Sequence, residues 1–134
     1  MKTFTVETRG RTELVSITRQ AQEAVRALGA QEGAALIFVP HTTAGVTINE
    51  DADPDVALDL AQALERALPA FAGFRHAEGN SDANVRASVV GSSVLVPIVE
   101  GQLALGAWQG VFLCEFDGPR RRQVCVQALG AAAH

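Results

Sequence analysis

The chain has 134 residues, a usual length for one domain, so we expect residues 1–134 to form a single domain. Hydrophobic residues make up 48% of it, and no run reaches the roughly 18 apolar residues that a membrane-spanning helix needs. The formal charge of -4 argues against the basic surface that duplex nucleic acids require, and the N-terminus lacks the apolar stretch of a secretory signal. We therefore expect a soluble cytoplasmic protein with neither a nucleic-acid nor a membrane partner.

The first 40 residues predict two strands, a helix and a third strand. Polar and apolar residues alternate over 2–8 and 12–17, which predicts two strands paired as a hairpin. From Thr18, a predicted N-cap, apolar residues recur at helical spacing until Gly29, which is predicted to end the helix. The continuous apolar run 34–39 is typical of a strand buried on both faces, and it leads directly to Pro40 and His41.

The middle of the chain predicts a short strand and two helices. After the strand 46–48, Asp53 and Pro54 indicate a capped helix start, and apolar residues then repeat at helical spacing until Pro69. The stretch 70–81 shows no period and is interpreted as a loop. Asp82 is a predicted cap for a short helix over 83–90, which Gly91 closes.

The C-terminal part is predicted to form antiparallel strands. Strands 92–99 and 102–105 are predicted to pair across a Glu100-Gly101 turn, and 108–116 with 121–129 across 117–119, before a frayed tail at 131–134. Cys114 and Cys125, on what are predicted to be neighbouring strands, are too few for a disulfide framework and are interpreted as reduced core thiols. The predicted class is α+β, with antiparallel β-sheets and two to three short helices.

Three polar groups could carry chemistry. In the first, His41, Thr42 and Thr43 end a buried strand, and a three-residue strand leads to Asn49, Glu50, Asp51 and Asp53. A hairpin would bring both parts together, and an imidazole with carboxylates can hold a hard cation or transfer a proton. The alternative is that Asp53 merely caps its helix and Asp51 is solvated.

The second group is a loop that leads into a helix N-terminus, where free N–H groups favour an anion such as phosphate. Its members are His76, Glu78, Asn80, Asp82 and Asn84. The alternative is that His76 is an ordinary surface residue.

The third group is Arg120, Arg121 and Arg122, of which one inward guanidinium could orient a phosphorylated ligand, unless all three are solvated. Trp108, the one tryptophan, stands between glycines and could pack in the core or at a subunit interface, or stack on a flat heterocycle.

Four segments follow one another between about His41 and the C-terminus: PHTTAGVTINE, DADPDV, GSSVLVPIVEGQLALGAWQG and FLCEFDGPRRR. Together they resemble the YjbQ-type family, the group labelled secondary thiamine-phosphate synthases. The resemblance implies a small α+β domain that assembles as a homotrimer, with polar sites near subunit boundaries. It also implies transferase chemistry that joins hydroxymethylpyrimidine diphosphate to thiazole phosphate and releases pyrophosphate.

On this basis we assign catalytic and metal-binding roles to His41, His76 and Glu50, with a divalent cation, magnesium or zinc, as the expected cofactor. The ligand is expected to be a phosphorylated small molecule. Substrate binding is assigned to Thr42, Thr43, Asn49, Asp53, Asp82, Asn84, Arg86, Trp108, Gln109 and Arg121.

One departure from the family pattern bears on the metal. Asn84 stands where relatives carry a histidine, and an amide oxygen suits magnesium or calcium better than zinc. Two alternatives to the synthase stay open at this point. One is a trimer that binds a metabolite or a metal without turnover, and the other is a metal-dependent hydrolase.

Overall fold

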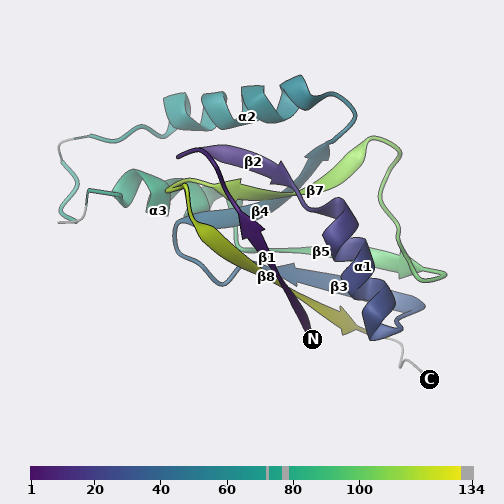
Figure 1. Ribbon diagram of the computed structural model, residues 1–134. Coiled ribbons are helices and arrows are strands. Elements are labelled where there is room, and N and C mark those ends of the chain that lie inside the picture. The colour runs from purple at the N-terminus through teal and green to yellow at the C-terminus, as the bar shows by residue number, and fades with distance from the viewer. Residues whose placement is uncertain (72, 77–78, 131–134) are drawn as a thin grey trace.

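Two antiparallel sheets and three helices make up the structure, a computed structural model that describes residues 1–71, 73–76 and 79–130 (Figure 1). Glu78 and the tail 131–134, for which predictions were made, lie outside the described residues. The larger sheet has the strand order β1 (Lys2–Glu7), β8 (Arg121–Leu129), β3 (Glu32–Phe38), β5 (Ser93–Val99) and β6 (Gln102–Leu103). The smaller sheet has the order β2 (Glu13–Ser16), β7 (Gln109–Glu115) and β4 (Ala44–Glu50).

The main core lies between the two sheets and also receives the apolar face of α1 (Thr18–Leu28). Alternate residues of each strand point into it, as a strand requires. Ile37, Val96 and Val124 come from the larger sheet, and Val46 and Leu113 from the smaller one.

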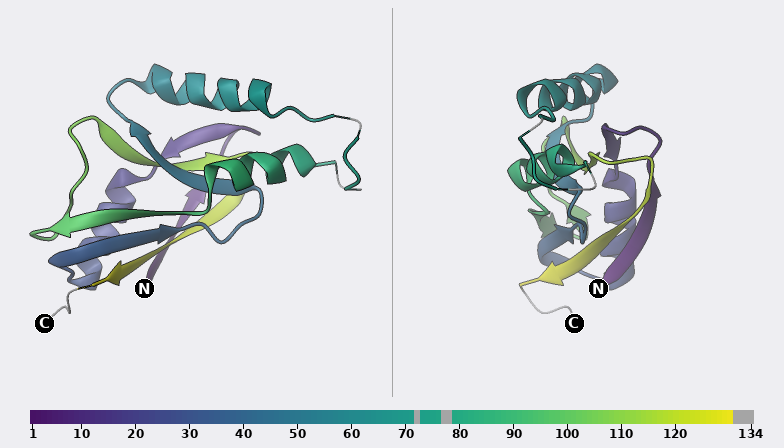
Figure 2. Two further views of the ribbon diagram at one scale, coloured as in Figure 1. Left: turned by 180° about the vertical axis from the view of Figure 1, so that it is seen from behind. Right: turned by 90° about the vertical axis from the view of Figure 1, so that its left-hand side faces the viewer.

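The other two helices, α2 (Pro54–Ala67) and α3 (Ser81–Val90), lie against the smaller sheet on the side away from the larger sheet (Figures 1 and 2). Ala83 and Ala87 of α3 pack there on Cys114 and Phe116. The smaller sheet is therefore covered on both faces, whereas the outer face of the larger sheet is open. The α+β class predicted from the sequence is confirmed.

The two hairpins predicted for residues 2–17 and 108–129 are wrong. β1 pairs with β8 and β2 with β7, so the first two strands belong to different sheets, and so do β7 and β8. The turns between them are corners: the Glu13 carboxylate accepts hydrogen bonds from the N–H groups of Arg9 and Gly10, and the Gly118 N–H donates to the Arg11 carbonyl. Each turn therefore carries the chain from one layer to the other. The short pair β5–β6 does form as predicted.

Most helix ends agree with the sequence, and two caps do not. Asp53 caps α2 by accepting from the Asp55 N–H at 2.9 Å, and Gly29 ends α1 with a left-handed φ of 69°. Thr18 is not a cap, because its hydroxyl accepts from the Val111 N–H at 2.9 Å. Asp82 lies inside α3, where it binds arginines, and Asn80 occupies the cap position.

Two further predictions concern burial. β3 is buried on one face only, since Phe38 is 40% exposed on the other. Cys114 and Cys125 are both free thiols, as predicted, but only Cys114 is buried in the core, and the two lie in different sheets and not on neighbouring strands. Burial raises the pKa of Cys114 to about 12. Among the described residues no helix is long and apolar enough to cross a membrane.

Candidate functional site

A cavity of about 540 Å³ lies between residues 41–44 and one side of α3, from Asn84 to the residues that follow the helix. This size falls within the usual range for small-molecule sites. Its lining, which we call the His41 pocket, is rich in hydroxyl and amide groups and contains three residues that the sequence nominated, His41, Thr42 and Asn84. The complete lining is His41, Thr42, Ala44, Asn84, Ala87, Ser88, Gly91 and Ser92.

The close approach of α3 to β4 forms one wall of this pocket. The Val46 N–H donates to the Gly91 carbonyl at 3.0 Å, and the Val39 N–H donates to the Ser92 carbonyl at 2.8 Å. A Cβ at Gly45 would overlap the Gly91 carbonyl oxygen, so only glycine fits between the strand and the end of the helix. Gly45, the glycine of the motif at residues 41–45, therefore allows the end of α3 to pack against β4 and form this wall.

His41 is fixed in one orientation by the backbone of β8. The Gln123 N–H donates to His41 Nε2 at 2.9 Å, which assigns the ring proton to Nδ1 of a neutral imidazole. Burial and the nearby Arg122 guanidinium lower the pKa of His41 below its ordinary value of 6.5, which favours the same neutral form. The Nε2 lone pair is already used, so His41 offers a hydrogen-bond donor at Nδ1.

A buried ion pair beneath the loop holds His41 and its neighbours in place. Arg122 donates through Nε to Glu115 Oε1 at 2.8 Å and through Nη2 to the Thr43 hydroxyl at 2.8 Å and carbonyl at 3.2 Å. Arg122 Nη2 also binds Glu115 Oε2, and the Thr8 hydroxyl donates to Oε1 at 2.7 Å. The loop is thereby tied to the same strand that holds the His41 ring.

The electrostatics of this pair favour the charged forms. Burial alone would raise the pKa of Glu115, but the hydrogen bonds from Arg122, the Asp117 N–H and Thr8 outweigh it and lower that pKa. Glu115 is fully buried and Arg122 is 4% exposed, so both charges are compensated within the protein.

Arg122 is thus the inward arginine, whereas Arg121, which the sequence nominated, is exposed and lies 3.8 Å from Glu7. The alternation with buried Val124 and Val126 was the signal that could have identified it. Sequence reasoning also missed Glu115, Ser88 and Ser92.

A second buried network lies near the N-terminus of α3, where the sequence predicted an anion site. Asp82 Oδ2 lies 3.0 Å from Nη1 of Arg11 and 2.9 Å from Nη1 of Arg86, and Asp82 and Arg86 are both buried. The hydrogen bond from Arg11 lowers the pKa of Asp82. Arg86 also donates to the Leu68 carbonyl, which connects α3 to the end of α2. These nominated residues therefore form a structural network.

The predicted convergence of His41 with Glu50 is wrong. β4 extends over seven residues, Ala44–Glu50, and at about 3.3 Å per residue it separates its two ends by roughly 20 Å. No group of three or more His, Cys, Asp or Glu side chains that could hold a metal occurs within residues 1–71, 73–76 and 79–130. The described residues therefore do not fit the metal centre predicted from His41, His76 and Glu50.

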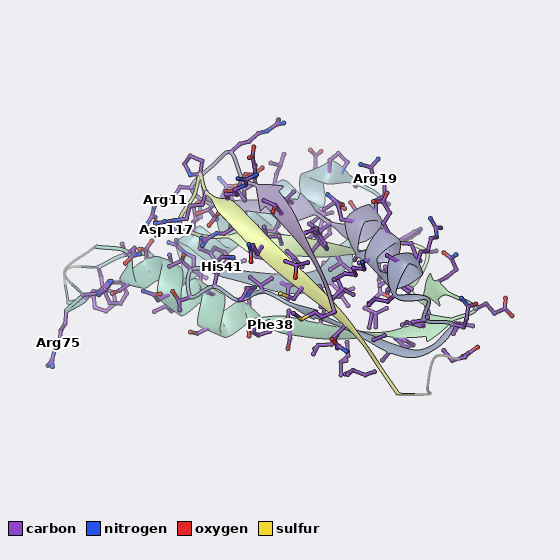
Figure 3. All side chains as sticks on the ribbon, turned by 60° about the horizontal axis from the view of Figure 1, so that its bottom comes forward. Arg11, Arg19, Phe38, His41, Arg75 and Asp117 are labelled. Atoms are coloured by element: carbon purple, nitrogen blue, oxygen red, sulfur yellow. The ribbon has the colours of Figure 1, made fainter. Side chains whose placement is uncertain are left out.

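His76 lies exposed on the loop between α2 and α3 and is not part of the His41 pocket lining. Its neighbour Arg75 projects from the far end of this loop, well away from His41 (Figure 3). The two imidazoles therefore do not share a crevice in this chain.

The remaining nominated residues lie at the other end of β4 and on the surface. Asn49 is exposed and accepts from the Glu50 N–H, and Gln109 accepts from the Gly106 N–H. Trp108 is 70% exposed, so the interpretation of this residue as part of the core is wrong.

Two layered antiparallel sheets with a pocket of hydrogen-bond donors define a small α+β protein with one rigidly held histidine. The family profile described as UPF0047 protein YjbQ-like matches residues 2–131, and the chain belongs to this family. A UPF0047 protein of Methanocaldococcus jannaschii is 46% identical over 95% of this chain and 92% of its own length. The Bacillus subtilis UPF0047 protein YugU is 44% identical over 97% and 99%.

Solved structures agree with this assignment. An uncharacterized conserved protein of the family from Clostridium acetobutylicum superimposes with a TM-score of 0.92 at 43% identity, covering 96% of this chain and all of its own. A conserved hypothetical protein from Thermus thermophilus gives a TM-score of 0.88 at 42% identity, with coverage of 96% and 100%.

These comparisons correct the expected activity. The names of these relatives give their family and no activity, and the Clostridium protein is described as uncharacterized. Nothing in them indicates thiamine-phosphate synthesis, so that assignment, and the transferase class with it, is wrong. The metal-binding expectation fails on the geometry given above.

Proposed function

We propose that the His41 pocket binds a small phosphorylated ligand through uncharged hydrogen-bond donors. The observation that carries this proposal is the 2.9 Å hydrogen bond from the Gln123 N–H to His41 Nε2, because it leaves Nδ1–H as a fixed donor. Thr42, Ser92 and the Asn84 amide supply further donor groups around the cavity. The lining contains no carboxylate that would repel an anion.

We also propose that the protein is cytoplasmic, as predicted from the sequence.

Calorimetric titration with ribose 5-phosphate and with ribose tests this proposal. We expect saturable binding of the phosphate ester only, and a loss of about tenfold or more in His41→Phe, since a hydrogen bond to a charged group contributes about 1.5–3 kcal/mol. His41→Gln should retain part of the affinity, because its amide can accept from Gln123 and still donate.

His76→Phe is the matched control, because this histidine does not line the pocket. Its affinity should equal that of the unaltered chain. Equal binding of ribose and ribose 5-phosphate would contradict the proposal, and so would an unchanged affinity in His41→Phe.

We also propose that the chain forms the homotrimer expected from the resemblance, through the open face of the larger sheet. Phe38, Leu95 and Leu129 are 40%, 60% and 43% exposed there, and Leu36 pairs directly with Leu95 between them. This apolar face explains why β3 has the sequence of a strand buried on both faces.

Light scattering coupled to size exclusion measures the assembly. Leu95→Glu is expected to yield monomers, because it places a charge in the centre of the apolar face. Leu58→Glu, at a 68% exposed position on α2, is expected to leave the trimer intact. A monomeric parent chain, or dissociation by the α2 variant alone, would refute this arrangement.

A further inference from the structure

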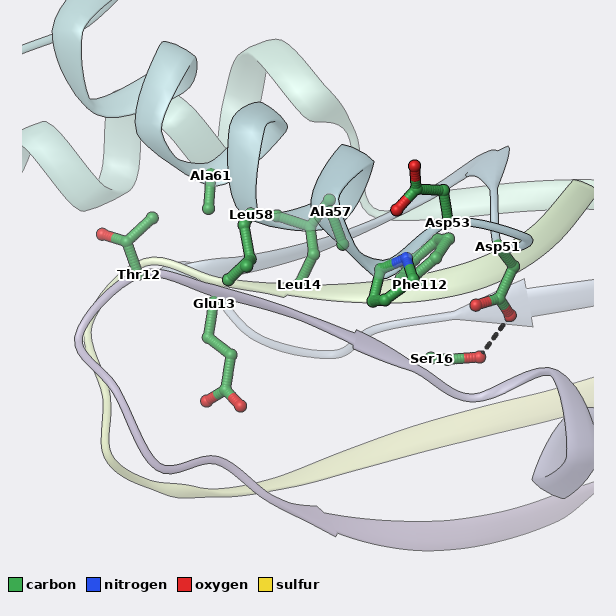
Figure 4. A pocket seen from close by; sticks show the side chains of 11 residues that line it. Thr12, Glu13, Leu14, Ser16, Asp51, Asp53, Ala57, Leu58, Ala61 and Phe112 are labelled. Atoms are coloured by element: carbon green, nitrogen blue, oxygen red, sulfur yellow. Dashed lines mark hydrogen bonds between the residues drawn. The ribbon is translucent and has the colours of Figure 1, made fainter.

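A second cavity, separate from the His41 pocket, lies under α2. It has a volume of about 370 Å³ and opens between α2, β2 and β7 (Figure 4). None of its lining residues is shared with the His41 pocket. We call it the α2 pocket.

The α2 pocket exists because α2 is incompletely packed. The helix has an apolar stripe, yet Ala61 is its one buried residue among those described. Leu58, one turn earlier, lines the cavity and is 68% exposed. Together with Leu14 and Phe112 of the smaller sheet, these side chains form an apolar floor and wall (Figure 4).

One end of the pocket is acidic. Asp53 lies beside the first turn of α2 and Asp51 lies next to Ser16, whereas the Glu13 side chain points away from the helix (Figure 4). Asp51 accepts through Oδ2 from the Ser16 hydroxyl at 2.6 Å, and Asp53 accepts through Oδ1 from the Asp55 N–H. The Thr18 hydroxyl also donates to Asp51 Oδ2, at 3.4 Å, and among the described residues no hydrogen bond or ion pair involves Asp51 Oδ1 or Asp53 Oδ2.

The position of Asp51 is fixed by the strand beneath it. A Cβ at Gly110 would overlap the Asp51 side chain, so the glycine allows the carboxylate to lie flat against β7. The Asp51 N–H also donates to the Trp108 carbonyl at 2.8 Å. The acidic end is therefore held in place before any ligand arrives.

Charge decides which ligand fits. No lysine, arginine or histidine lines the α2 pocket, and the partial charge of about +0.5 at a helix N-terminus is smaller than two aspartate charges. A ligand with an apolar body and a cationic end would cover the apolar wall and meet both carboxylates. We propose that the α2 pocket binds a small organic ammonium ion, an alkyl or aryl amine.

Phenethylamine and 3-phenylpropionate are suitable probes, since they share a phenyl ring and a short chain but carry opposite charges. Amide resonances of the full chain, followed during each titration, should shift in a saturable way around Ser16, Leu58 and Phe112 with the amine only. The paired variant Asp51→Asn with Asp53→Asn should weaken binding roughly tenfold, because each partly exposed ionic contact contributes up to about 1 kcal/mol.

These substitutions preserve the local structure. An asparagine at 53 still caps the helix, and one at 51 can still accept from Ser16. Asp55→Asn is the matched control, as it alters the same helical turn outside the pocket lining, and it should bind like the parent chain. Ala57→Phe, which fills the cavity, should abolish the shifts.

Three results would overturn the proposal. They are equal shifts from the amine and the acid, unchanged affinity in the double asparagine variant, and no saturable shift at all, which would include the case in which another copy of the chain covers α2. Because His41 plays no part in this experiment, its outcome is independent of the phosphate-ligand proposal.

Discussion

Glu115→Gln is expected to lower the free energy of unfolding by about 3 to 5 kcal/mol, the usual cost of leaving one partner of a buried ion pair uncompensated. Arg122 is 4% exposed, so water would compensate its charge poorly and the guanidinium would face a neutral amide. The Thr8 hydroxyl and the Asp117 N–H also donate to the Glu115 carboxylate, and one of them would lose its acceptor. Urea denaturation at pH 7 measures the difference.

The matched control is Glu7→Gln, which breaks the exposed ion pair with Arg121 at 3.8 Å. Surface pairs of this kind contribute about 0 to 1 kcal/mol, so this variant should unfold close to the parent chain. Combining Glu115→Gln with Arg122→Met should cost less than the sum of the two single changes, because the pair is removed together. A cost below about 1 kcal/mol for Glu115→Gln would show that the pair does not anchor the loop.

The local elements of this fold were predictable because their signals are local. The helical periods, the Asp53-Pro54 start of α2 and the glycines that end α1 and α3 all depend on neighbouring residues. The partners of the strands were not predictable in the same way. The chain joins β1 to β2 and β7 to β8 by turns that look like hairpins, yet each turn crosses between the layers.

The candidate site shows the same limit. His41, Thr42 and Asn84, which the sequence placed in two separate polar groups, line one cavity, because the loop after β3 lies against α3. Their role in binding stays a prediction. The acidic residues that follow β4 belong to the α2 pocket instead. A three-residue strand would have allowed a hairpin, but the seven-residue β4 sends Asp51 and Asp53 to the opposite end of the sheet.

Asp82→Asn is expected to cost about 3 kcal/mol or more, because Asp82 compensates Arg86, which is 3% exposed, and also binds Arg11. The pH dependence has a defined sign. The hydrogen bond from Arg11 lowers the pKa of Asp82 below its ordinary value of 3.8, so its contribution is complete above that pH. As the pH falls further, the folded carboxylate becomes protonated and the contribution is lost. The stability difference between parent and variant should therefore shrink in acid.

Variants of Arg86 and Arg11 measure separately the buried and the exposed contact of Asp82. The Arg11 side chain is 46% exposed, so Arg11→Met should cost about 1 kcal/mol or less, since solvent already screens this contact. Arg86→Met should cost more, because its Nε–H also holds the Leu68 carbonyl at 3.0 Å and so connects α3 to the end of α2. Equal costs for the two variants in urea denaturation would contradict this argument. They would mean that the buried contact of Asp82 with Arg86 contributes no more stability than its exposed contact with Arg11.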